Sequence, residues 1–528
     1  FNQYKPRLTR VVWREYQRGI DYKRRIGLYE RVRENENFYI GRQWEGVHAP
    51  DLDKPVLNIL GRVVSYFIAM VSSDDIAISA SPMGRAQTPE LRRRLEVLEA
   101  QLGQLFEGND LPARSKDLLR AAAVDGDAYL HFYFDADAPT GQAAQGLLRA
   151  EQLENTEVFY GNPLSDEKES QPYLLIAARV PVARLEEQMR AAAVAGADRL
   201  RPDAGFGGGD PDEPADHATV LCRYWKQAGR VWVCKSTASV LVLPPADTGY
   251  RRYPLAAMSW ERVRGSCHGQ AAVTGLIPNQ IAINKLFAMA IKYQRELAFP
   301  KILYDRTKLE RWSNRIGAIG VNGDPSSVVA RYAGGAEMSD QVLLLIDRLI
   351  AYTRDLMGAS DAALGNVRPD NTSAIVAVQQ TTAIPLELRR RAFYQMMEET
   401  ARVLLDMASV DYGVRRVVCT AADGAQQESL FDFGRMAELL PELRVDVGQS
   451  AYFSELGELA TLDNLYAKGI ITDALDYLEA VPDGRIRNKR RLIEALRARR
   501  ARDEAAPSPE PPAEPAGKEV KQHALSEL

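Results

Sequence analysis

The chain has 528 residues, of which 46% are hydrophobic and 26% are charged, and its formal net charge at pH 7 is −4. This length and composition are those of a globular protein with roughly three or four domain-sized units. The small net charge excludes a polycation that coats nucleic acid over its whole surface, so any contact with DNA or RNA must come from local patches.

The four cysteines are widely spaced and form no CxxC pair. We therefore expect neither a disulfide framework nor a zinc site, and a reducing compartment fits better. Cys267 and His268 are adjacent, but a structural metal site needs four ligands. No apolar run approaches the ~18 residues of a membrane span, and no signal peptide is recognisable before the first helix. The sequence thus indicates a cytosolic protein, and we expect no cofactor and no metal.

Residues 1–36 are predicted to be helical and are basic on balance. Two interpretations of this segment stay open: a solvated helix face, or contact with phosphates or an acidic partner. A turn-rich connector over 38–60 leads into an apolar helix over 59–71. Asp74 and Asp75 follow, and because no further ligands lie at usable spacing, they indicate a helix end or turn rather than a metal site.

The next part of the chain is helical from 89 to 123 and then strand-rich. Residues 127–135 alternate and are rich in aromatic side chains, which predicts a strand, and His131 within it is expected to be a packed core residue rather than a base. Further strands are predicted near Tyr173 and over 221–244, where a small antiparallel sheet turns at Gly229. The Gly-, Pro- and Asp-rich stretch 195–216 lacks the GK[ST] ending of a phosphate-binding loop, so we expect a mobile surface loop.

Two long helices with a small insert between them come next. The first is predicted over 270–299, with Pro278 in its first turn, and Phe299-Pro300 ends it. Residues 301–336 are short and mixed in character. The second helix begins at Glu337 and ends at Gly358, and the following residues share its apolar face: Met338, Val342, Leu345, Ile346, Leu349, Tyr352 and Leu356.

A polar loop follows the second helix, and after it a longer helical segment begins at Ser373. Pro385 lies in the middle of that segment, and its ring predicts a kink. Near the C-terminus, leucines at 456, 459, 462 and 465 predict another helix, and Thr472 can cap the one after it. Asn488 can cap a strongly basic helix. The tail beyond Arg502 is rich in Pro, Glu and Ala, which predicts disorder.

The order of these parts, together with four phrases, resembles the portal proteins of tailed bacteriophages. The phrases are GRQWEG (41–46), RGSCHGQAAVTGLIPNQIAINKL (264–286), NTSAIVAVQQTTAIPLELRRRAFYQ (371–395) and ATLDNLYAKGIITDALDYLEAVPDGRIRNKRRLIEAL (460–496). The resemblance implies an α+β, predominantly helical fold with a wing, a two-helix stem, an α/β clip and a helical crown. The parts it implies are the wing at 1–270 and 373–447, stem helices at 271–299 and 337–357, the clip at 300–336, a tunnel loop at 358–372, the crown at 448–502 and the tail at 503–528.

The resemblance also implies a role. Portal proteins form a ring, dodecameric in assembled capsids, at one capsid vertex of the virion. Double-stranded DNA passes through the ring during genome packaging and ejection. The implied partners are other copies of the chain, DNA, the terminase that hydrolyses ATP, the head-to-tail adaptor, and the major capsid and scaffolding proteins, with no membrane. Assembly is expected in the host cytoplasm, and the chain itself is not expected to be an enzyme.

Charged residues on the implied stem and loop are candidates for lining the DNA channel. They are Lys285, Lys292, Arg295 and Glu296 on the first helix, Asp340, Asp347, Arg348, Arg354 and Asp355 on the second, and Asp361, Arg368 and Asp370 in the loop. The basic crown helix, with Lys489, Arg490, Arg491 and Arg497, is a candidate for contact with packaged DNA. Ordinary solvated helix faces remain the alternative for both sets.

Two other classes of protein are alternatives to this resemblance. A helical nucleic-acid-binding adaptor or scaffold that forms no ring would share the basic segments. An enzyme is disfavoured because the sequence holds no nucleophile elbow, HExxH or Walker pattern and only five histidines.

Overall fold

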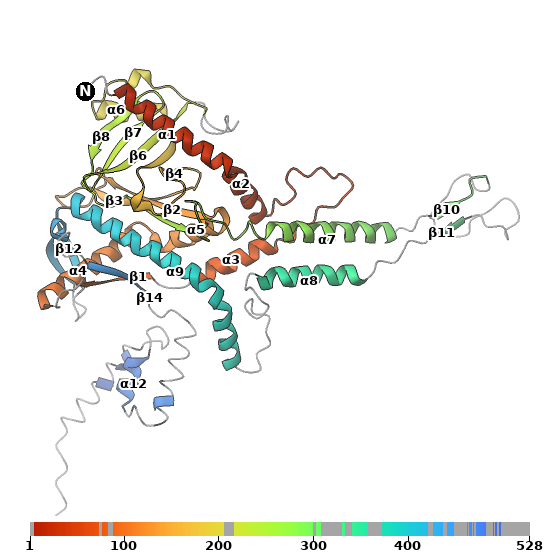
Figure 1. The fold of residues 1–528 in the computed structure, drawn as a ribbon. Coiled ribbons are helices and arrows are strands. Elements are labelled where there is room, and N and C mark those ends of the chain that lie inside the picture. Colours follow the sequence, from red (N-terminus) through yellow and green to blue (C-terminus); the bar gives the residue numbers. More distant parts are fainter. Residues whose placement is uncertain are drawn as a thin grey trace, which may run out of the picture. The chain divides into compact units, whose positions relative to one another are not determined.

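A computed structural model describes residues 5–72, 76–82, 88–204, 216–298, 302–307, 330–332, 340–356, 372–420, 426–436 and 441–447, together with scattered positions between 462 and 497. The chain divides into two compact units, Phe1–Gly448 and Gln449–Leu528. Figure 1 draws the elements of both and labels most of them. The first unit carries nearly all of the described structure.

The first unit begins with helices. α1 (Lys5–Arg25) and α2 (Leu28–Tyr39) are separated at Gly27, whose φ of 63° is the left-handed conformation that favours glycine. α3 (Ile59–Val71) starts at Asn58, whose side chain accepts a hydrogen bond from the Gly61 amide, as an N-cap does. α4 (Pro89–Gly108) and α5 (Leu111–Asp125) follow. The helices predicted over 1–36, 59–71 and 89–123 are thus confirmed where they are described.

Two antiparallel sheets follow from the alternating segments. The first has the order β3 (Leu147–Leu153), β2 (Asp127–Asp135), β9 (Leu255–Ser259). The second has the order β4 (Val158–Tyr160), β5 (Leu174–Pro181), β6 (His217–Gln227), β7 (Arg230–Ser236), β8 (Leu241–Asp247). The predicted strand at 127–135 and the predicted turn at Gly229, which has φ 77°, are both confirmed. Residues 205–215 of the predicted surface loop lie outside the described residues.

Alternate residues of β6 pack on opposite sides of the second sheet, as the two-residue period of a strand requires. Leu221 packs with Val12, Tyr16 and Ile20 of α1. Ala218 and Val220 pack on the other side, with Leu185 and Met189 of α6 (Val182–Ala191). α1 and α6 therefore cover opposite faces of this sheet.

The main core forms around α9 (Thr372–Asp411), which packs against β9, β2 and β14 (Pro441–Val447). Its buried side chains include Phe393, Met396 and Leu404. Figure 1 shows that α9 bends partway along its length. Pro385 lies inside this helix, and its assignment as the cause of the kink stays a prediction.

The remaining strands form three short antiparallel pairs. β14 pairs with β1 (Ile76–Pro82), β12 (Val414–Thr420) pairs with β13 (Gln426–Asp432), and β10 (Ile302–Tyr304) pairs with β11 (Ala330–Tyr332). In the second unit, α12 (Ala474–Ala480) is capped by Asp473, which accepts from the Leu475 amide, so the predicted cap at Thr472 was one residue too early. Asp74 and Asp75, Gly358 and the tail beyond Arg502 lie outside the described residues.

Candidate functional sites: the α7–α8 hairpin and the Asp127 cluster

α7 (Ile277–Ala298) and α8 (Asp340–Leu356) are the two long helices that the sequence predicts, and they lie side by side (Figure 1). The predicted start of the first helix at residue 270 was too early, because residues 272–276 form turns. Pro278 occupies the first turn of α7, where its missing N–H costs nothing. Ile283 and Ala288 of α7 and Ile346 and Thr353 of α8 are buried. The Thr353 hydroxyl donates to the Leu349 carbonyl at 2.7 Å, which satisfies it within the helix.

A network of buried side-chain amides fixes the beginning of α7. Asn284 Nδ2 donates to Gln43 Oε1 at 2.6 Å, and Gln280 Nε2 donates to Asn284 Oδ1 at 3.0 Å. Gln43 Nε2 in turn donates to Asn58 Oδ1 at 3.2 Å. Unpaired amides cost free energy when they are buried. This chain of hydrogen bonds therefore fixes how α7 packs against the connector that precedes α3.

α8 leaves much of its apolar surface uncovered by the described residues. Leu344 is 53% exposed, Leu345 is 50% exposed and Tyr352 is 56% exposed. The predicted apolar face therefore splits: Ile346 is buried, whereas Leu345 and Tyr352 are not. Large apolar side chains gathered on one exposed helix face are typical of an interaction surface.

The side chains predicted to line a channel differ in their placement. Lys285, Asp347 and Arg348 are exposed, and Lys292 is half-buried. Arg295 is paired with Asp53 of the connector at 3.0 Å. The predicted loop residues Asp361, Arg368 and Asp370 lie outside the described residues.

The basic residues predicted for the crown lie in the second unit. Lys489 is half-buried and its Nζ donates to the Val481 carbonyl at 2.6 Å. Arg491 and Arg497 are exposed, and Arg490 is outside the described residues. Among these, Lys489 contacts its own chain, which sequence reasoning did not foresee.

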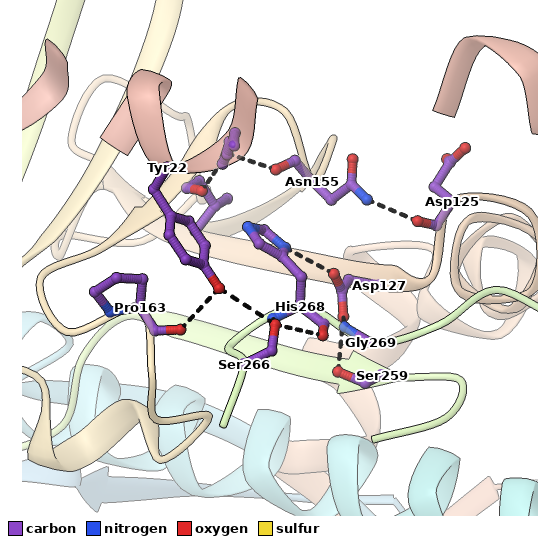
Figure 2. Close-up of polar contacts among 11 residues, drawn as sticks. Tyr22, Asp125, Asp127, Asn155, Pro163, Ser259, Ser266, His268 and Gly269 are labelled. Atoms are coloured by element: carbon purple, nitrogen blue, oxygen red, sulfur yellow. Dashed lines mark hydrogen bonds and ion pairs between the residues drawn. The ribbon is translucent and has the colours of Figure 1, made fainter. Parts of the chain in front are cut away.

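A second site lies where β2 begins, and it is built around the Asp127 carboxylate (Figure 2). Asp127 Oδ1 accepts from the Ser259 hydroxyl at 2.7 Å and from the Gly269 amide at 2.8 Å. Asp127 Oδ2 lies 2.9 Å from His268 Nδ1. Because a carboxylate only accepts hydrogen bonds, Nδ1 carries the hydrogen, and Nε2 of the neutral ring keeps a lone pair.

Two glycines make this close approach possible. A Cβ at Gly126 would lie 2.8 Å from the Gly269 carbonyl oxygen, and a Cβ at Gly269 would lie 2.7 Å from Ser259 Cβ. Gly126 also has φ 102°, which L side chains rarely adopt. The pair therefore allows the segment before α7 to lie directly against the start of β2, and this brings His268 to Asp127.

Lys23 of α1 reaches the same region and is only 1% exposed. Its Nζ donates to the Asn155 and Val158 carbonyls, each at 2.6 Å, and lies 3.7 Å from the centre of the Phe159 ring. Burial lowers the pKa of Lys23 to about 7, partly opposed by the nearby Cys267 and Asp127. Burial likewise lowers the pKa of His268, opposed by its hydrogen bond to Asp127.

Sequence reasoning missed this cluster. The sequence places Lys23 in a basic helical segment, and the adjacent Cys267 and His268 suggest only metal ligation. The described residues contain no group of three or more His, Cys, Asp or Glu side chains that could hold a metal ion. His131, by contrast, is a buried residue as predicted, with Nδ1 2.7 Å from Glu151 and Nε2 2.9 Å from the Tyr224 hydroxyl.

Comparison with known proteins adds one finding. Residues 179–438 match the family model described as phage P22-like portal protein. No curated protein matches the chain. The matched span contains α7, α8 and α9. Within the described part of the chain, no helix is both long enough and apolar enough to cross a membrane.

Proposed function

We propose that copies of this chain form a ring with an axial channel for double-stranded DNA. The premise is that the chain belongs, through residues 179–438, to the phage P22-like portal protein family. The ring would occupy one capsid vertex and serve both packaging and ejection of the genome. Twelve copies, a terminase that supplies ATP hydrolysis, and an adaptor that docks on the ring are parts of this proposal. The family is a structural one, and the proposal assigns the chain no catalysis.

The exposed apolar side chains of α8 are the observation that supports this proposal. Leu344, Leu345 and Tyr352 are about half exposed on a helix whose opposite side packs against α7. In a closed ring every interface is heterologous, so one face of a subunit meets a different face of the next. A neighbouring copy would cover this surface of α8, and the hairpin would form part of the channel wall.

The experiment compares the particle mass of the wild-type chain with that of the double variant Leu344→Lys, Leu345→Lys by mass photometry and negative-stain imaging. Each substitution removes about 1 kcal/mol of the free energy that apolar burial contributes to every interface. It also adds the cost of desolvating an ammonium group. We expect rings from the wild type and monomers from the variant. Leu164→Lys, at a loop residue that is 66% exposed, is the matched control and should still form rings. A monomeric wild type, or rings of unchanged stability from the double variant, contradicts the proposal.

The proposed channel wall carries both signs of charge, since the exposed Lys285, Arg348 and Asp347 all belong to it. DNA that moves through a channel must not be held, and neutralising many phosphates would bind it tightly and with strong salt dependence. A lining of mixed charge, repeated around the axis, avoids such tight binding of the DNA. We expect that Asp361→Lys together with Asp370→Lys slows packaging by a purified motor without preventing ring assembly. An unchanged packaging rate would remove these loop residues from the proposed lining.

The division into wing, stem, clip, tunnel loop and crown, with the boundaries given above, belongs to the same proposal. So does contact between packaged DNA and the basic residues Arg490, Arg491 and Arg497 of the crown. Cutting the chain after Pro482 should weaken DNA association by isolated rings and flatten its dependence on salt. Rings that keep full salt-sensitive binding after this truncation would argue that the contact lies elsewhere.

A further inference from the structure

A cleft beside the Asp127 cluster takes no part in the proposed passage of DNA. It has a volume of about 440 Å³, which lies in the range of small-molecule sites. α1 forms one wall of it, and the segments around 159–163 and 267–268 form the others. Its polar lining comes from Arg18, Asp21, Lys23, Arg25, Cys267 and His268.

The buried imidazole of His268 offers an unused hydrogen-bond acceptor to this cleft. His268 is 3% exposed, and its Nδ1 is committed to Asp127. Figure 2 shows the other ring nitrogen on the side away from Asp127, without a dashed line. No described residue donates a hydrogen bond to it. This nitrogen keeps a lone pair and His268 lines the cleft, so a ligand that brings a hydrogen-bond donor can pair with it.

The charges around the cleft favour an anion. Arg18 and Arg25 lie exposed on α1 and outnumber Asp21, the one acidic side chain of the lining. Guanidinium groups at the mouth can bind an oxyanion in bidentate fashion.

An anion that also donates a hydrogen bond can pair both with the arginines and with Nε2 of His268. We propose that this cleft binds inorganic phosphate, which still carries a P–OH at neutral pH. The arginines bind its charged oxygens, and its P–OH donates to Nε2 of His268. Sulfate has the same shape and charge but no hydroxyl at neutral pH, so it leaves Nε2 unpaired. The site is independent of ring formation, since all of its residues belong to one copy.

The test measures binding of inorganic phosphate, a nucleoside monophosphate and sulfate to the full chain by isothermal titration calorimetry at pH 7.5. We expect inorganic phosphate to bind at least about tenfold more tightly than sulfate, which is the size of one hydrogen bond made or missed. The nucleoside monophosphate, whose ester phosphate has a second pKa of about 6 and has lost its last proton at this pH, should bind no more tightly than sulfate. A nucleoside monophosphate that binds as tightly as inorganic phosphate would show that the P–OH makes no difference to affinity, and it contradicts the proposal. Equal affinity for phosphate and sulfate, or no binding of either, overturns the proposal.

Three variants connect the binding to this cleft. His268→Gln should abolish the preference for phosphate over sulfate. Arg18→Gln, at an exposed position that leaves the core intact, should weaken both anions several-fold and keep the preference, so the test survives if the His268 variant fails to fold. Arg14→Gln, exposed on the same helix outside the cleft, is the control and should change neither affinity. Unchanged phosphate binding by Arg18→Gln would place the anion elsewhere and overturn the assignment.

Discussion

The buried amine of Lys23 makes a quantitative prediction about stability and pH. Its pKa is about 7 in the folded chain, whereas the ordinary value is 10.5. Between these two values the unfolded chain binds a proton that the folded chain has lost. Stability therefore rises with pH through this window, by about 1.4 kcal/mol per pH unit for this group. Over the whole window the gain approaches about 5 kcal/mol, which is large beside the ~5–15 kcal/mol that stabilises a typical domain.

Lys23→Met removes the titrating group and keeps the length of the side chain. The variant leaves the Asn155 and Val158 carbonyls without their donor, a cost that does not depend on pH. We therefore expect the free energy of unfolding of the wild type, relative to the variant, to rise by about 3 kcal/mol from pH 7 to 9.5. Urea denaturation followed by tryptophan fluorescence at four pH values measures this difference.

Lys116→Met is the matched control, because Lys116 is an exposed lysine on α5. Its unfolding free energy should follow that of the wild type at every pH. A wild-type-minus-Lys23→Met difference that stays constant from pH 7 to 9.5 would refute the reasoning, since it would mean that Lys23 keeps an ordinary pKa in the folded chain.

Two further predictions concern packing and the root of the hairpin. Gly269→Ala puts a Cβ 2.7 Å from Ser259 Cβ and should lower the free energy of unfolding by about 3 kcal/mol, measured by the same urea titration. Gly275→Ala is the control, because its Cβ meets nothing within 4 Å, and it should be nearly neutral. Asn284→Leu leaves Gln43 Oε1 without its donor and should cost about 2 kcal/mol, seen as faster amide exchange in the first turns of α7. Exchange at the wild-type rate in that variant would show that the amide network does not fix the helix.

Local patterns in the sequence predict the elements of this fold well. Pro278 and the apolar spacing that follows it mark α7, and the alternation through 127–135 marks β2, because both signals lie within a single element. The apolar period of α8 is equally clear, yet it could not say that Leu345 stays exposed while Ile346 is buried. Periodicity identifies an apolar face but not the chain that covers it.

The Asp127 cluster, in contrast, could not be predicted from local patterns in the sequence. Lys23 is basic and lies among other basic residues, so its local pattern is that of a solvated helix face. Its burial depends on carbonyls more than 130 positions away in the sequence, and the contact between Asp127 and His268 spans 141 positions. Two glycines, each unremarkable in the sequence, permit that contact only once the two segments meet. No short-range signal encodes such a juxtaposition.

The pairing of β1 with β14 has a consequence for how the chain is made. Ser79 and Arg444 face each other across this ladder and are separated by 365 positions. At the ribosome's pace of ~5–20 residues per second, β1 waits on the order of 20–70 seconds before its partner strand is synthesised. During that interval the nascent chain presents an open strand edge, and the helix that completes the main core is also still missing. The first unit of this protein therefore reaches its native form only after Val447 has been synthesised.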